Sequence, residues 1–166
     1  ADDFSLQPWL SYGWEARGQK DSSQNIQSKS LHPIAIGIGH QNIIYYFEQG
    51  DFNELTAEGS LSVRRQYKYT VFGLHYFNDS WGFTEYFVPY VGASLGANNE
   101  IIETNLSGNI TVDHSRYYTL AETHLALYWN YTKFLWVSFE TRLFFGEKTD
   151  PTPEFSVLGR IGFWFR

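Results

Sequence analysis

The side chains best suited to catalysis are charged and polar groups on two neighbouring strand-like segments. His124, Glu140 and Ser138 can be arranged as the base, the orienting acid and the nucleophile of a hydrolase triad. The tight connection between the two segments implies a hairpin register that sets His124 beside Glu140. Arg142 and Arg160 are expected close to the same acid, so a structural salt-bridge network is favoured. We therefore expect no catalytic residue.

Metal ligands are not grouped along the chain. There is no cysteine, and the remaining histidines have no spacing typical of a metal site: His32, His40, His75 and His114. The acidic run Asp51, Glu54 and Glu58 could hold a divalent cation loosely, but a solvated loop is the favoured interpretation. No phosphate-binding loop or dinucleotide fingerprint is present. The sequence predicts neither a metal site nor a cofactor.

The elements that position these groups are predicted to be strands, because apolar residues recur with a period close to two. Short connections alternate with long polar ones, the latter at 18–29, 51–58, 98–113 and 147–153. This pattern is typical of an antiparallel up-and-down barrel with short periplasmic turns and long extracellular loops. The eight expected strands cover residues 7–17, 30–39, 42–50, 59–77, 83–97, 114–130, 134–146 and 154–165.

Two chemically different faces follow from the alternation. One face of each strand is apolar and aromatic, whereas the other carries charges among small residues. No amphipathic helix is available to cover the apolar face, so we expect it to point outward and the charges to fill the lumen. Buried charges must be paired. Glu122 is expected beside Arg142, and Lys68 and Arg64 opposite Gly92 and Gly96. The predicted lumen network consists of Glu15, Arg17, Arg64, Lys68, Glu122, His124, Glu140, Arg142 and Arg160.

Composition agrees with a barrel that crosses a membrane. Aromatic residues make up 19% of the 166 residues, and no stretch approaches the roughly 18–20 apolar residues of a transmembrane helix. The net charge of −6 disfavours nucleic acid as a partner. Outward aromatic residues are expected to form girdles at the membrane interfaces. The predicted girdle residues are Trp9, Trp14, Tyr67, Tyr69, Trp129, Phe163 and Phe165.

Three short motifs carry a resemblance to a known family. They are the segment 69–77 with the turn Asn78-Asp79-Ser80-Trp81, the segment Pro89-Tyr90-Val91-Gly92-Ala93 continuing to Gly96, and the final 160–165. The chain resembles the small OmpA/OmpX-like outer-membrane proteins. That resemblance implies one barrel domain over 1–166 in the bacterial outer membrane, in contact with lipopolysaccharide, with a last strand read by the barrel assembly machinery. The start Ala1-Asp2-Asp3 is what signal-peptide removal would leave. Arg166 departs from the family, whose chains usually end on an aromatic residue.

Two classes of function stay open on this scaffold. The favoured one is a non-enzymatic anchor that displays extracellular loops for adhesion or envelope integrity; the alternative is a lipid A-modifying enzyme or a narrow pore. The pair Asp79-Ser80 resembles one in the lipid A palmitoyltransferase but is expected in a periplasmic turn. His114 with Ser115 could begin a site at the outer rim, yet neighbouring strand residues point to opposite faces. A soluble lipocalin-like carrier, suggested by Gly13-Trp14, is a third and weaker interpretation.

Overall fold

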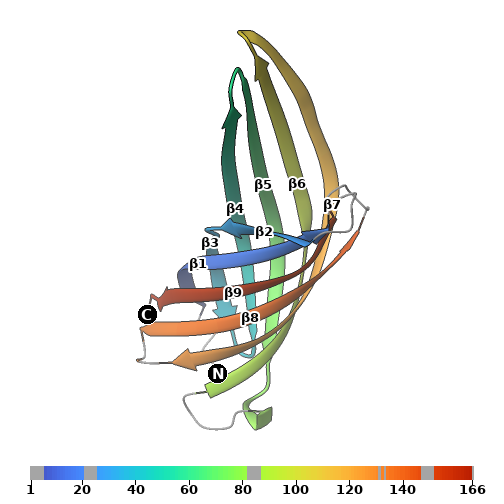
Figure 1. Ribbon diagram of the computed structural model, residues 1–166. Helices are drawn as coiled ribbons and strands as arrows, with labels where there is room; N and C mark the ends of the chain where they lie inside the picture. Colours follow the sequence, from blue (N-terminus) through green and yellow to red (C-terminus); the bar gives the residue numbers. More distant parts are fainter. Residues whose placement is uncertain are drawn as a thin grey trace.

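The computed structural model describes residues 6–20, 26–81, 87–130, 132, 134–146 and 152–165, and nearly all of them lie in one antiparallel sheet. Its first and last strands pair with each other, which closes the sheet into a barrel (Figure 1). A short 3₁₀ turn, η1 (Asp79–Trp81), follows the fifth strand. The strands are β1 (Gln7–Lys20), β2 (Ile26–Leu31), β3 (Ile34–His40), β4 (Ile43–Glu58), β5 (Leu61–Phe77), β6 (Phe87–Leu106), β7 (Asn109–Asn130), β8 (Leu135–Gly146) and β9 (Thr152–Trp164).

The nine strand elements make an eight-stranded barrel, as expected, because β2 and β3 follow each other along β1 and together count as one strand of the barrel. Both pair with β1, and only residues 32 and 33 separate them. Proline at position 33 has no N–H to donate to the ladder, so the strand is interrupted there. Its carbonyl still accepts a hydrogen bond from the N–H of Gly13, at 2.8 Å. The strand predicted over 30–39 is thus one strand of the barrel with an interruption.

Two of the four connections predicted as long loops are strand instead. Residues 51–58 belong to β4, and most of 98–113 belongs to β6 and β7. The pairing of β4 with β5 runs without a break from Ile43↔Tyr76 to Glu58↔Leu61. The hairpins close in two-residue turns, where Gly59, Ser107 and Gly108 take the positive φ that such turns require.

The four strands β4 to β7 therefore rise beyond the rest of the barrel (Figure 1). We call residues 53–66 and 101–115 the extension. Within the described residues, β4 beyond Gln49 pairs only with β5, and β7 before Leu120 pairs only with β6. The extension is thus a four-stranded sheet with two open edges. Its two tips are joined by a hydrogen bond from the N–H of Ser107 to the carbonyl of Ser60, at 3.0 Å.

Alternation sorts the side chains of the barrel as expected for β1, β7, β8 and β9. Within the barrel, their described charged side chains are buried inside together with Trp9, Trp136 and Leu158, and the apolar residues predicted for the outer face lie outside. Within the described residues no helix is long and apolar enough to cross a membrane.

The face predicted for the fifth strand is wrong. In β5 the side chains of Tyr67 and Tyr69 are buried inside the barrel, whereas Arg64 and Lys68 are exposed. The register differs as well, since His75 and not Lys68 lies opposite Gly92. Tyrosine is compatible with either face, because its hydroxyl can bond to buried charges while its ring packs.

Three predicted girdle residues also lie elsewhere. Trp9, Tyr67 and Tyr69 are 2%, 5% and 0% exposed and belong to the interior core. Trp14 is exposed on β1. Trp129, Phe163 and Phe165 are exposed near the short-turn end of the barrel, where Trp129 stacks on Phe87.

A candidate functional site inside the barrel

The interior is occupied by charged side chains that hold one another. Arg142 lies at its centre. Its Nε donates to Glu140 at 2.6 Å, while Nη1 and Nη2 donate to the two oxygens of Glu48 at 2.6 and 3.1 Å. The same Nη1 lies 3.4 Å from a carboxylate oxygen of Glu122. A planar guanidinium offers five donors in a fixed fork, so one arginine can bridge three acids.

Arg17 forms a second group on the extension side of the lumen. It donates to Glu15 from Nε and to the Tyr67 hydroxyl from Nη1, both at 2.8 Å. Its Nη2 lies 3.4 Å from Glu122, which links it to the central group. The guanidinium also covers the ring of Tyr69, 4.1 Å from the ring centroid. Such contacts satisfy a cation that burial has stripped of water.

The third arginine, Arg160 of β9, lies on the other side of the central group. It forms an ion pair with Glu48, and its Nε is 3.4 Å from Glu140. The structure thus brings together seven of the nine residues predicted for the lumen, namely Glu15, Arg17, Glu122, His124, Glu140, Arg142 and Arg160. The other two, Arg64 and Lys68, are on the outside.

The expected contacts form although the pairing of β7 with β8 is shifted by two residues from the expected register. His124 lies opposite Arg142 along the ladder, and Glu140 lies opposite Ala126. His124 Nδ1 is nevertheless 3.3 Å from Glu140. A shift of two keeps every side chain on its face, and long side chains span the difference.

Glu48 is the acid that sequence reasoning missed. It is fully buried and binds both Arg142 and Arg160. The signal was present in β4, where outward Tyr45 and Phe47 alternate with inward Tyr46 and Glu48. An acid between apolar neighbours at that spacing indicates the lumen face.

Two histidines meet at the centre of the lumen, on the side of the short turns. His75 Nε2 lies 3.1 Å from His124 Nδ1, although the residues are 49 positions apart. The Tyr46 hydroxyl lies at the same distance from that nitrogen. On the far side of the ring, His124 Nε2 is 3.0 Å from Glu122. Both histidines lie opposite Gly92 of the intervening strand β6, and the missing side chain at that glycine lets the two rings meet.

The described interior carries more negative than positive fixed charge. Four buried carboxylates, those of Glu15, Glu48, Glu122 and Glu140, face the three guanidiniums of Arg17, Arg142 and Arg160. One further positive charge would balance the site. Both ring nitrogens of His124 face carboxylates.

The hydrolase triad considered from the sequence is not assembled. Among the residues that the structure describes, Ser138 Oγ is buried without a hydrogen-bond partner. A different serine, Ser94, lies 3.3 Å from His124 Nε2, but its hydroxyl donates to Glu122 at 2.7 Å. All of these groups are buried inside the barrel.

Comparison with known proteins finds likeness in structure alone. No family model and no curated protein sequence matches the chain. Three solved structures superpose along nearly its whole length. The attachment invasion locus protein Ail of Yersinia pestis, in complex with the heparin analogue sucrose octasulfate, has a TM-score of 0.68 at 14% identity, covering 97% of this chain and 99% of Ail.

Neisserial surface protein A superposes with a TM-score of 0.64 at 14% identity, covering 96% of this chain and 95% of its own. The N-terminal β-barrel domain of Pseudomonas aeruginosa OprF gives 0.59 at 15% identity, with coverages of 97% and 100%. This chain has the fold of the small OmpA/OmpX-type outer-membrane barrels. The expected fold class is therefore confirmed, with the correction that two long loops are strands.

Proposed function

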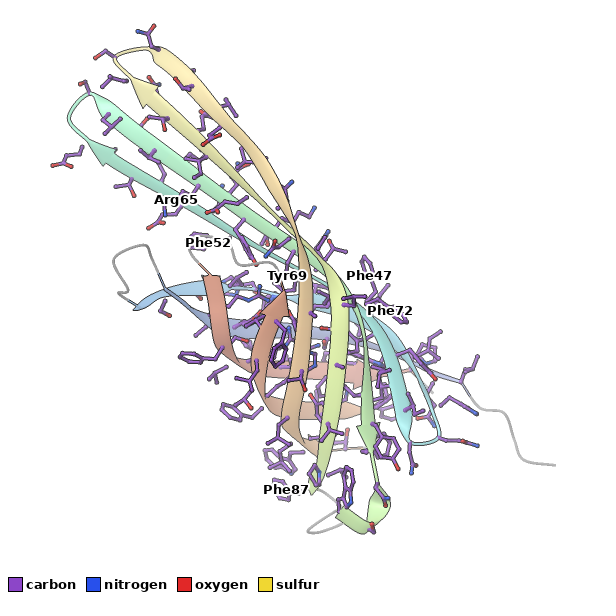
Figure 2. The ribbon with its side chains drawn as sticks, turned by 90° about the vertical axis from the view of Figure 1, so that its right-hand side faces the viewer. Phe47, Phe52, Arg65, Tyr69, Phe72 and Phe87 are labelled. Atoms are coloured by element: carbon purple, nitrogen blue, oxygen red, sulfur yellow. The ribbon has the colours of Figure 1, made fainter. Side chains whose placement is uncertain are left out.

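We propose that the protein is an integral protein of the bacterial outer membrane, a non-enzymatic anchor that presents the extension to a partner outside the cell. Support for the membrane comes from the outer wall of the barrel, which is apolar around its circumference. A closed barrel leaves no unpaired backbone groups toward lipid. Figure 2 shows Phe47 and Phe72 on this wall and Arg65 on the extension. The exposed apolar side chains include Tyr12, Ile36, Phe47, Phe72, Leu74, Val91, Leu125, Phe139 and Leu143.

The extension is the observation that carries the anchor function. A strand needs about 9–11 residues to cross a bilayer, but β4, β5, β6 and β7 have 16, 17, 20 and 22. The surplus forms a sheet whose open edges can pair with a strand of another protein. Its tips also expose apolar residues, among them Leu55, Leu106 and Ile110. Surplus length with open edges and apolar tips is suited to binding a protein.

Charge makes a sulfated polysaccharide the less suitable partner. By sequence the extension carries four carboxylates, Glu54, Glu58, Glu103 and Asp113, against Arg64 and Arg65. Ail was solved with a heparin analogue, but a surface with excess negative charge repels such a polyanion. The partner proposed here is a protein surface.

Catalysis and conduction find less support. The polar groups close enough to act together are enclosed in the lumen, and fully buried side chains such as Trp136, Arg142 and Tyr90 fill it. His114 and Ser115, considered at the rim, lie in β7, but their side chains lie outside the described part of the chain. Glu147 and Lys148, also considered at the rim, lie outside the described residues.

The test removes the extension and keeps the barrel. Phe52 pairs with Tyr67, and Glu100 pairs with Arg116. In the shortened chain an Asn-Gly turn replaces the residues between the two members of each pair. We expect a non-adherent bacterial strain displaying the full chain to bind cultured epithelial cells, and the shortened barrel to lose that binding. Sucrose octasulfate should not compete.

The control is the amount of each barrel in the outer membrane, measured by its heat-dependent migration on gels. Equal adhesion by the two barrels would contradict the proposed role of the extension. Competition by sucrose octasulfate would replace the protein partner with a polyanion.

A further inference from the structure

Four potential metal ligands from four strands of the barrel lie close together in the lumen. His124 Nδ1 from β7 lies 3.1 Å from His75 Nε2 of β5, 3.1 Å from the Tyr46 hydroxyl of β4 and 3.3 Å from a Glu140 oxygen of β8. The ligand atoms of the two histidines and the glutamate all lie within 4.8 Å of one another. None of the four side chains is more than 3% exposed.

Hydrogen bonds alone account poorly for this grouping. A ring nitrogen has one lone pair or one hydrogen in the plane of the ring, so it serves one partner well. Here three polar atoms surround His124 Nδ1 at nearly equal distances. Ligands of a tetrahedral zinc ion, each about 2.0–2.1 Å from the metal, lie about 3.3 Å from one another. The three separations from His124 Nδ1 match that spacing.

The outer ring nitrogens make the contacts that metal-binding histidines usually make. His124 Nε2 is 3.0 Å from Glu122, and His75 Nδ1 is 3.2 Å from the Tyr128 hydroxyl. A carboxylate on the distal nitrogen fixes the tautomer that leaves the other nitrogen free to bind a metal. Glu140 is held in turn by Arg142 at 2.6 Å and by the Tyr90 hydroxyl at 2.7 Å. The donors are thus oriented before any metal arrives.

We propose that His75, His124 and Glu140 bind a zinc ion inside the barrel, with the Tyr46 hydroxyl at the fourth position. Two imidazoles and a carboxylate, with no thiolate, suit zinc better than calcium or magnesium, which prefer oxygen ligands. The described interior has one carboxylate more than it has guanidiniums, so a cation meets a favourable charge. The ion would link side chains of β5, β7 and β8 inside the barrel and so stabilise the closed sheet.

Because the site is enclosed, the full chain is refolded from denaturant into detergent micelles with or without zinc, and free metal is removed on a chelating column. Elemental analysis then gives the metal content. We expect about one zinc per chain and a rise in melting temperature of about 5–10 °C with excess zinc. Magnesium and calcium should give neither.

His75→Gln is the decisive variant and His32→Gln is its matched control, since His32 is exposed on the outer side. The control should bind zinc as the unchanged protein does, and His75→Gln should lose binding. Cobalt in the unchanged chain gives a second readout, because tetrahedral coordination has a visible spectrum that loose surface binding lacks. Absence of zinc and of that spectrum in the unchanged chain, or zinc retained in a folded His75→Gln, would overturn the proposal.

Discussion

The barrel and the extension are built from the same strands, yet they are stabilised in opposite ways. In the barrel, β4 also pairs with β3 and β7 also pairs with β8, so each of the four strands β4 to β7 has a partner on both sides. Inward side chains such as Glu48 and His124 are fully or almost fully buried there. In the extension, β4 and β7 are open edges of the sheet, and Leu55 and Ile110 are each 62% exposed. Closure, rather than strand sequence, decides which charges must be paired. Substitutions of similar chemistry should therefore have very different effects in the two regions.

The largest difference is expected between two arginines. Arg142→Ala would leave Glu48 and Glu140 without their central partner, and removing one member of a buried charge network typically costs about 3–5 kcal/mol. Arg65→Ala, on the extension, should change stability by less than about 0.5 kcal/mol. Urea unfolding of the refolded barrels in lipid vesicles measures both. Similar effects for the two would remove the distinction between the regions.

Charge on the outer face gives the second contrast. Leu125 is exposed on the barrel wall, near the middle of the segment of β7 that pairs with β8. Leu125→Arg would place a charge against lipid and should destabilise the protein by about 2–4 kcal/mol. Leu55→Arg on the extension should have almost no effect. The comparison is made in vesicles and repeated in detergent, where the penalty for Leu125→Arg should shrink. A penalty of equal size in both media would argue against a lipid-facing wall.

Two glycines of the barrel sharpen the comparison within one region. A Cβ at Gly96 would collide with the backbone of Thr70 and Val71, whereas one at Gly159 would meet no atom within 4 Å. Backbone gives way less easily than a side chain, so Gly96→Ala should cost about 1–3 kcal/mol. Gly159→Ala should be nearly neutral. Thermal melting followed by circular dichroism separates the pair, and equal melting temperatures would mean that β5 and β6 approach less closely.

The smallest effect is expected for removal of the whole extension. The shortened barrel that joins residue 52 to 67 and residue 100 to 116 keeps the buried ion pairs found among the described residues. Its free energy of unfolding should change less than that of Gly96→Ala. A large loss of stability in urea would show instead that the long hairpins support the closed sheet.

The sequence predicted the faces of β1, β7, β8 and β9 because their charged residues alternate with large apolar ones. It failed on β5, where Tyr67 and Tyr69 look apolar but bond to buried charges: the Tyr67 hydroxyl accepts from Arg17, and the Tyr69 hydroxyl donates to Glu15. It also took residues 51–58 and 98–113 for loops, since strands without a buried face have no apolar alternation. The meeting of His75 with His124 was missed because the expected register placed Lys68, and not His75, opposite Gly92, which also lies opposite His124.

The hydrogen bond between the two hairpin tips has a mechanical consequence. Because β5 pairs with β6 as far as Leu61 and Leu106, and Ser107 is joined to Ser60 just beyond them, the two hairpins form one continuous sheet. A pull on the tip acts along the strands, whereas the hydrogen bonds between antiparallel strands lie across them. Such a load is shared by many bonds at once in shear, instead of opening them one after another. A cell held through this sheet would lose its contact with the partner before the sheet unfolded.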